Sequence, residues 1–554
     1  MSAVELQLTH AILREHFGTI VEQVGSTLGQ RGRLPLRLLV QLTGLKVRQV
    51  QQALVVLIQH NLVTWAESPH RMHMLVFYVL DIRRVLLRLR IGDVLGLTQE
   101  LFDKEGLQIV QQILLAGKLT VSKLKDKLRW STLTPANRRV YLRHLQTLVR
   151  HRYLEGVKYT DSVTVDDQNI ALDAKARESL AAIPNAKEIA RIRQMRVERS
   201  EAEFQENRLV GMKRKIAEDD DNDKDAMKIR IGGFEMVEEL DEDVYFRVNF
   251  ERFNVQLRTK RLVDFAHERV NKSGAVVFRS MMALFDDRLR LCREELSPPA
   301  SLLQVTHQLP QGHTLNKDID LHATDFGMDM HSQSGELDGN SVDNGSSQTV
   351  VQAFLQLLQT DTEGIVFRDD FRSKGQYRVN FVRARTKLRD AVLFSYLQEK
   401  FGPFSCRVVR ILRETHKLDD KQLAKLALLP PKVVRQVVHE MLAKGFIQLQ
   451  EVPRTSERTP ATCYYLFYTS PEISHQVCLQ LHYEEIGKLL SRRTHELELR
   501  KLLLEKTNRE DVRKDPSLLT AGDKRALDSL QKTLDLIDAS LLRLDRQVLI
   551  LRDF

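Results

Sequence analysis

The sequence predicts a mainly α-helical protein with small β-hairpins. Apolar residues recur at helical spacing, and aromatic residues make up only 6% of the chain, which favours many small helical cores over one large sheet. A unit of three helices and a β-hairpin recurs along the chain. The last helix alternates apolar steps of three and four residues. Together these observations predict tandem winged-helix domains plus a C-terminal antiparallel coiled-coil hairpin.

The first domain is expected over residues 1–81. After a first helix, Pro35 stands where the fixed φ of proline suits the start of a second. Gly44 and Asn61 are expected to end the second and third helices, because both residue types tolerate a left-handed backbone. The expected strands of the hairpin lie at 62–65 and 72–80. This order of elements is typical of a winged helix.

The same pattern returns near the C-terminus. A shift of 384 positions places residues 39–63 on residues 423–447 without a gap. The apolar positions that coincide are Leu39 with Leu423, Leu42 with Leu426, Leu45 with Leu429, Val50 with Val434, Leu54 with Val438, Leu57 with Met441, Leu62 with Phe446 and Val63 with Ile447. Asn61 coincides with Gly445, so both units are expected to end their third helix in the same way.

The other boundaries follow from weaker copies of this pattern and from composition. They are winged helix 2 at 82–183, a charged linker at 184–240, winged helix 3 at 241–383 with a long polar loop at 297–345, winged helix 4 at 384–470, and the coiled-coil hairpin at 471–554. The basic triplet Lys213–Lys215 precedes an acidic run, so the second half of the linker is expected to be solvated or disordered. The triplet is either a nuclear import signal or ordinary linker charge.

Sequence motifs for catalysis are absent. No phosphate-binding glycine loop, zinc-protease motif or nucleophile elbow occurs, and the four cysteines are too scattered for a metal clip. No apolar run approaches the ~18 residues that a membrane-spanning helix needs. We therefore expect a non-enzymatic, intracellular protein with no catalytic residue, no cofactor, no metal and no membrane contact.

A nucleic acid is the expected ligand of the basic surface. The net charge of +10 is compatible with a polyanion partner, although an ordinary basic surface would look the same. The candidate DNA-binding residues on the third helices of domains 2 and 4 are Arg138, Arg139, Arg143, Arg150, Arg152, Lys432 and Arg435. Arg83, Arg84, Arg88 and Arg90 add a basic strip after the first wing. The alternatives for these residues are a solvated face or an acidic protein partner.

The C-terminal hairpin is the expected site of assembly with a partner protein. The candidate partner-binding residues in its seam are Leu527, Leu534, Leu541 and Val548. Arg493 and Arg500 interrupt the apolar repeat of the first arm.

Several short segments of the sequence resemble those of one protein family. They are Leu13–Gly18, Leu57–Val63, Gly117–Thr120, Glu399–Gly402 and Gln450–Pro453. In this order they are similar to the third-largest subunit of eukaryotic RNA polymerase III, a winged-helix subunit similar to the large subunit of the RNA polymerase II promoter-opening factor. The resemblance extends over nearly the whole chain.

The resemblance implies a function. Members of that family form a subcomplex with two other polymerase III subunits on the clamp of the largest subunit, and support promoter-directed initiation and DNA opening at 5S rRNA and tRNA genes. It further implies a nuclear, non-catalytic protein that meets single- or double-stranded DNA; some members are linked to cytosolic DNA sensing. Two alternatives remain at this point: a free-standing winged-helix regulator, and a winged-helix scaffold without DNA contact.

Overall fold

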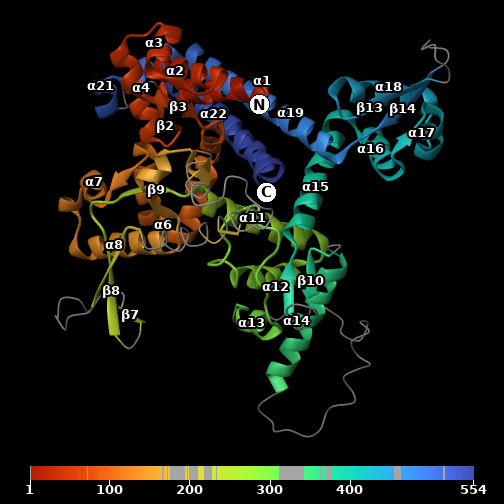
Figure 1. Ribbon diagram of the computed structural model, residues 1–554, viewed down its shortest axis with the longest axis horizontal. Coiled ribbons are helices and arrows are strands. Elements are labelled where there is room, and N and C mark those ends of the chain that lie inside the picture. Colours follow the sequence, from red (N-terminus) through yellow and green to blue (C-terminus); the bar gives the residue numbers. More distant parts are fainter. Residues whose placement is uncertain are drawn as a thin grey trace. The chain divides into compact units, whose positions relative to one another are not determined.

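The chain folds into two compact units, each of which is described by itself. The first comprises Met1–Phe253 and Tyr483–Leu542, and the second comprises Asn254–His482 and Arg543–Phe554. Figure 1 shows the helices and small sheets of both. The computed structural model describes residues 2–70, 73–164, 167–170, 173–174, 194–195, 198, 210–216, 228–231, 234–310, 342–361, 364–369, 376–453, 463–515 and 518–554. The acidic run after Lys215, the tip of the last wing at 454–460 and most of the polar loop, 311–341, lie outside these residues.

Winged helix 1 has a three-stranded sheet in the order β1-β3-β2. Its elements are α1 (Ala3–Phe17), α2 (Thr19–Arg31), β1 (Leu34–Pro35), α3 (Leu36–Thr43), α4 (Val47–Gln59), β2 (Val63–His70) and β3 (His73–Leu80). Ser2 begins α1 with a capping box, since its side chain accepts from the Glu5 amide while the Glu5 carboxylate accepts from the Ser2 amide. Gly44 ends α3 in the left-handed conformation, as its position predicts.

Winged helix 2 extends further along the chain than the sequence predicts. Its elements are α5 (Ile82–Leu86), η1 (Leu87–Arg90), α6 (Ile91–Ala116, kinked at Phe102–Asp103), β4 (Leu119–Thr120), α7 (Val121–Lys127), η2 (Trp130–Thr132), α8 (Pro135–Arg150), β5 (Leu154–Gly156), η3 (Tyr159–Ser162) and β9 (Tyr245–Val248). The sheet order is β4-β9-β5, so the second strand of the wing is β9. A boundary at residue 183 is therefore wrong, because the strand that completes this sheet comes after the long insertion.

The expected linker, 184–240, contains a second sheet. Strands β6 (Met212–Ile216), β7 (Lys228–Ile231) and β8 (Phe234–Leu240) form an antiparallel sheet in the order β6-β8-β7. The basic triplet lies in β6, where Lys213 is opposite Glu239 and Arg214 is opposite Glu238. The expectation of a disordered segment is therefore wrong for the basic triplet, which lies in strand β6.

Winged helix 3 belongs to the second unit and carries a long insertion. Its elements are α11 (Phe250–Arg269), α12 (Lys272–Ala283), α13 (Leu302–His307), α14 (Val342–Asp361), β10 (Val366–Asp369) and β11 (Gln376–Val379). The first residues of the expected loop, 297–345, are ordered. Ala300 bridges to Tyr377, and the Ser297 hydroxyl accepts from the Val379 amide at 2.8 Å. These contacts tie the start of the loop to β11 through an isolated bridge, which the polar composition of the loop did not indicate.

Winged helix 4 repeats the sheet order of the first domain, with β12-β14-β13. Its elements are α15 (Phe381–Phe401), α16 (Pro403–Thr415), β12 (Lys417–Leu418), α17 (Asp420–Ala427), α18 (Pro431–Lys444), β13 (Gln448–Pro453) and β14 (Cys463–Tyr468). The burial of the two copies agrees at the coinciding positions: Leu39 and Leu423 are fully buried, whereas Leu42 and Leu426 are both half exposed. The internal repeat is therefore a structural repeat.

All four domains end the helix that precedes the wing in the same way. Asn61, Arg152, Gly364 and Gly445 have φ values of 59°, 63°, 82° and 86°. Each is followed by two residues that are at most 3% exposed: Leu62 and Val63, Tyr153 and Leu154, Ile365 and Val366, Phe446 and Ile447. The left-handed residue reverses the chain so that the first wing strand starts in the core. The cap predicted at Asn61 and Gly445 thus defines the whole repeat.

The C-terminal segment is helical, with two long antiparallel helices. Its elements are α19 (Pro471–Leu499), α20 (Lys501–Asn508), α21 (Glu510–Lys514), α22 (Ala521–Val548) and a π-helical turn, Leu549–Asp553. In the first unit, Arg493 Nε lies 3.3 Å from Asp538 Oδ1. In the second, His482 Nε2 lies 2.6 Å from Gln547 Oε1. Both pairs join α19 to α22 in antiparallel order. No helix in the described part of the chain combines the length and apolarity needed to cross a bilayer.

Candidate nucleic-acid interface

The helix that precedes the wing of winged helix 2 is α8, and it is amphipathic. Thr134 caps its start by accepting from the Asn137 amide at 3.4 Å, and Pro135 occupies its first position. Tyr141, Leu145, Leu148 and Val149 are buried on one face. The helix has no acidic residue, so its outward face is basic and polar.

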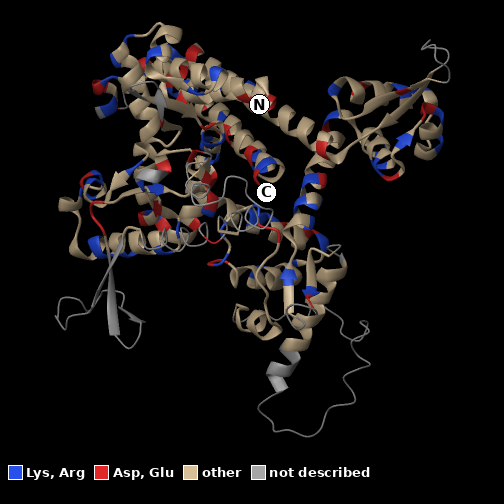
Figure 2. Ribbon diagram, viewed as in Figure 1, with Lys and Arg blue, Asp and Glu red and all other residues tan. Residues whose placement is uncertain are grey.

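Positive charge is concentrated on α7, α8 and the turn between them. Residues 121–152 contain nine lysines and arginines and a single acidic residue, Asp126. These elements are blue at many positions in Figure 2. Arg139 and Arg143 are exposed on α8, and Lys127 and Arg129 are exposed just before it. Lys125 is paired with Glu242 at 2.5 Å. An excess of exposed cations attracts phosphate groups, and salt weakens that attraction.

The five arginines predicted in this domain have different surroundings. Arg138 holds the turn before α8, because its Nε donates to the Trp130 carbonyl at 3.0 Å and its Nη2 to the Ser131 carbonyl at 3.2 Å. Arg150 is half-buried, and Arg152 is the half-buried residue with left-handed backbone that ends the helix. Arg139 and Arg143 are therefore the arginines best placed to meet a ligand.

The helix of winged helix 4 that corresponds to α8 is α18, and its surroundings are less basic than those of α8. Lys432 is exposed. The Nε of Arg435 donates to Asp420 Oδ2 at 2.9 Å, so its charge is matched within the domain. Lys432 and Arg435 belong to the second unit, whereas the arginines of α8 belong to the first.

Winged helices 1 and 2 meet along a polar junction that sequence patterns do not reveal. The side-chain amide of Gln59 donates to two carbonyls at the end of α6, those of Ala116 at 3.2 Å and Lys118 at 2.7 Å. Gly117, with φ of 81°, lies so close that a Cβ there would be 2.4 Å from the Gln59 carbonyl oxygen. Only glycine permits this approach, so the geometry of α8 relative to the first domain depends on it.

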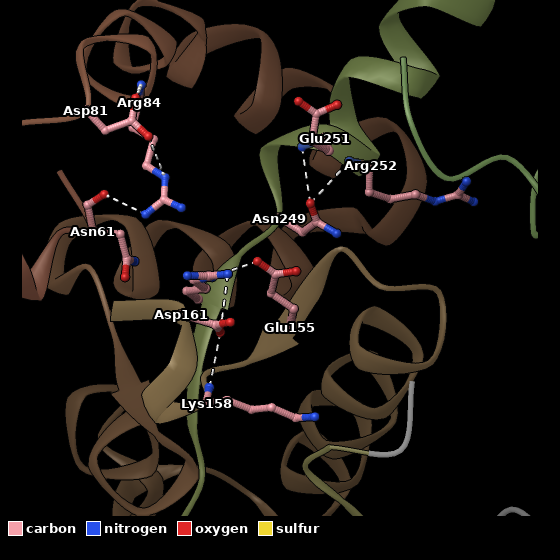
Figure 3. A network of polar contacts seen from close by, with 10 residues as sticks. Asn61, Asp81, Arg84, Glu155, Lys158, Asp161, Asn249, Glu251 and Arg252 are labelled. Carbon is pink, nitrogen blue, oxygen red and sulfur yellow. Dashed lines mark hydrogen bonds and ion pairs between the residues drawn. The ribbon is translucent and has the colours of Figure 1, made fainter. Parts of the chain in front are cut away.

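A network of ion pairs continues this junction (Figure 3). Arg247 on β9 pairs with Glu155 at 2.6 Å and Asp161 at 3.5 Å. Nearby, Arg84 pairs with Asp81 at 3.2 Å and donates to the Asn61 carbonyl at 3.1 Å. Burial lowers the pKa of Arg84, and the positive charge of Arg247 lowers it further against the opposing effect of the carboxylates. The carboxylates of the network neutralise its arginines, so the network has a structural role at the junction.

The basic strip predicted at residues 83–90 is largely structural too. Arg88 lies over the Phe17 ring at 4.7 Å and donates to His16 Nδ1 at 3.3 Å, and burial lowers its pKa to about 10. Arg90 is fully buried. Of the four arginines of the strip, Arg83 is exposed, Arg84 and Arg88 are half-buried and Arg90 is buried, so the strip does not present all of its charges to solvent.

The predicted partner-binding residues of α22 lie toward the interior. Leu527, Leu534 and Leu541 are half-buried, and Val548 is 1% exposed. Arg493, which interrupts the seam of α19, forms ion pairs with Glu15 of α1 and Asp538 of α22. The seam thus packs within the chain, and its role in binding a partner stays a prediction.

A metal site is not apparent in the described ranges. No group of three or more His, Cys, Asp and Glu side chains there is placed to hold a metal ion. The four cysteines are free thiols.

The chain has four winged-helix units, and the helix α8 of one of them is strongly basic. It is therefore a modular winged-helix protein with a surface of the kind that contacts nucleic acid. Comparison with known protein families agrees in detail. The model of RNA polymerase III subunit RPC82 matches residues 143–412, that of its helix-turn-helix domain matches 7–68, and that of the POLR3C C-terminal winged-helix domain matches 393–469.

Curated relatives match over their full length. The human DNA-directed RNA polymerase III subunit RPC3 is 25% identical over 576 residues, which cover 100% of this chain and 98% of the relative. The protein of the same name from Rattus norvegicus is 26% identical, with the same coverage, and RPC-3 from Coccidioides immitis is 24% identical over 659 residues, with 100% of both chains covered. The chain belongs to this family of non-catalytic RNA polymerase III subunits, and it associates with other subunits of that polymerase.

Proposed function

We propose that this subunit supports promoter-directed initiation by RNA polymerase III and that the basic face of α8 holds the DNA. In this proposal the chain works in the nucleus within a three-subunit subcomplex on the clamp of the largest subunit. It helps to open DNA at 5S rRNA and tRNA genes without taking part in nucleotide addition. A free-standing regulator is disfavoured, because the family consists of polymerase subunits.

The observation that carries the DNA contact is the charge of residues 121–152, with nine basic residues against one acidic residue. Arg139 and Arg143 project from the exposed face of α8, and the opposite face is buried in the domain core. A rigid helix with cations on one side suits the contacts to phosphate oxygens that position a protein on DNA. Such contacts are independent of sequence, which fits a subunit that serves many promoters.

The contact is tested by charge reversal in the assembled polymerase. Arg139→Glu with Arg143→Glu reverses two exposed charges and leaves the buried face of α8 intact. We expect DNA affinity to fall alike for all sequences. The slope of log affinity against log salt should become shallower by about one unit per lost phosphate contact. Fluorescence anisotropy of labelled promoter DNA between low and moderate salt measures both.

The control is Arg525→Glu on α22, which makes the same change of charge as each single substitution, at an exposed position outside α7 and α8. It should leave the slope unchanged. If the double variant of α8 keeps the wild-type slope, α8 is a protein interface or a solvated face. The same titration with single-stranded and duplex DNA identifies which form the helix prefers.

A further inference from the structure

Winged helix 4 has an apolar hollow beside α18, the helix that corresponds to α8. A cavity of about 400 Å³ opens between α18 and the wing strands β13 and β14. Its apolar lining comes from Val438 and Leu442 of α18 and from Leu449, Tyr465 and Phe467 of the wing. The hollow beside α8 in winged helix 2 lies at a different place, between α6, α7 and α8, and holds about 10 Å³. A volume of several hundred cubic ångström is in the range that accommodates a ligand or the anchor side chains of a partner.

Part of the apolar lining reaches solvent. Leu449 is 37% exposed, and Tyr465 and Phe467 are half-buried. Leaving such surface in water is unfavourable. Concave apolar surface with a polar rim is typical of a protein-binding site.

The rim of this cavity is acidic. Asp419 and Asp420 stand at the start of α17, where the Asp419 carboxylate accepts from the Asp420 amide at 2.8 Å. The lining also contains His439 and Arg435, and Arg435 is bound to Asp420. Burial raises the pKa of Asp420, but hydrogen bonds from Arg435 and within the helix start outweigh it, so the group stays ionised. Two carboxylates beside one arginine leave the rim with an excess of negative charge.

This chemistry excludes a role like that of α8. A DNA backbone would bring phosphates against the two carboxylates and would offer nothing to fill the apolar cavity. A polypeptide segment supplies both complements, apolar side chains for the cavity and a lysine or arginine for the rim.

We propose that the cavity between α18 and the wing of winged helix 4 binds a segment of another polypeptide of the polymerase. Its large apolar side chains enter between Leu442, Leu449 and Phe467, and its lysine or arginine meets Asp419 and Asp420. The same fold thus serves two purposes in one chain: winged helix 2 presents charge to a nucleic acid, and winged helix 4 presents a pocket to a protein.

Photocrosslinking in the intact polymerase tests this assignment. A benzophenone amino acid replaces Leu449 at the cavity, and in a control chain it replaces Leu428, which is 84% exposed on the same domain and does not line the cavity. The crosslinked peptide is identified by mass spectrometry. We expect position 449, but not 428, to crosslink to a segment of another subunit that contains apolar residues and at least one lysine or arginine. A crosslink to DNA, to this chain, to a second copy of it, or none above the control would overturn the proposal.

A substitution gives the second readout. Leu449→Glu places a charge at a partly exposed position and should weaken retention of the crosslinked subunit in salt washes by at least about tenfold. Its thermal unfolding and the salt slope of DNA binding should match wild type. Unchanged retention would contradict the proposal. An altered salt slope with unchanged retention would instead mean that this face contacts DNA.

Discussion

The junction between the first two winged helices makes the sharpest structural prediction. Gly117 follows α6 with φ of 81°, and a Cβ there would meet backbone only: the Gln59 carbonyl oxygen at 2.4 Å, the Gln59 carbonyl carbon at 2.9 Å and the His60 Cα at 2.9 Å. Backbone atoms cannot rotate away as the end of a flexible side chain can. Gly117→Ala must therefore separate α4 from the end of α6.

The magnitude follows from three contributions. An alanine with positive φ costs about 1–2 kcal/mol. The separation also breaks the hydrogen bonds from Gln59 to the Ala116 and Lys118 carbonyls, each of which contributes about 1 kcal/mol. We expect Gly117→Ala to destabilise the junction by about 3–4 kcal/mol. Gln59→Ala, which removes only the hydrogen bonds, should cost about 2 kcal/mol.

Hydrogen exchange measured by mass spectrometry localises the effect within a multidomain chain. In Gly117→Ala, peptides that cover the end of α4 and the end of α6 should lose protection together. The control is Gly96→Ala, because Gly96 lies within α6 and a Cβ there meets nothing within 4 Å; it should stabilise the helix by about 0.5–1 kcal/mol. Wild-type protection of both segments in Gly117→Ala would refute the reasoning.

Three further predictions concern backbone, pH and the hairpin. Arg152→Gly should stabilise winged helix 2 by up to about 1 kcal/mol, whereas Gly445→Ala should destabilise winged helix 4 by about 1 kcal/mol, since both positions have positive φ; denaturant unfolding measures each. Burial lowers the pKa of the half-buried His60 to about 4, and the nearby Arg88 and His16 add to this effect. The contribution of His60 to stability is therefore complete above pH 6.5 and is lost as the pH falls toward 4. Unfolding at pH 7 and pH 4.5 should differ less in His60→Gln than in wild type, and an equal difference would assign the acid sensitivity elsewhere. Leu534→Asp with Leu541→Asp should abolish entry into the polymerase, whereas Leu536→Asp, at a position 71% exposed, should not; normal co-purification of the double variant would contradict a structural seam.

Local sequence signals predicted the repeated unit because its determinants are local. The left-handed position at Asn61 and Gly445, and the buried positions around it, depend on residues within one helix and the next strand. The extent of winged helix 2 could not be predicted in this way. Its strand β9 pairs with β5 across the long insertion that follows Gly156, and a pairing of such high sequence separation leaves no periodic signal.

The candidate site was predicted in part. The excess of arginine on α8 is visible in the sequence, but the sequence does not distinguish Arg138, which holds the Trp130 and Ser131 carbonyls, from the exposed Arg143. Likewise, the pairing of Arg435 with Asp420 depends on the packing of α18 against α17. Charge composition identifies the helix, and tertiary contacts decide which of its side chains can meet a ligand.

The central claim is that the exposed arginines of α8 act on DNA during initiation and not during RNA synthesis. Transcription by polymerase assembled with Arg139→Glu and Arg143→Glu tests it most directly, on a duplex promoter and on a pre-melted template in parallel. We predict that promoter-dependent initiation falls at least about tenfold, while elongation on the pre-melted template stays at the wild-type rate. The control Arg525→Glu should have wild-type activity on both templates. Equal activity of the double variant and the wild type on the duplex promoter, or an equal loss on both templates, would contradict this account.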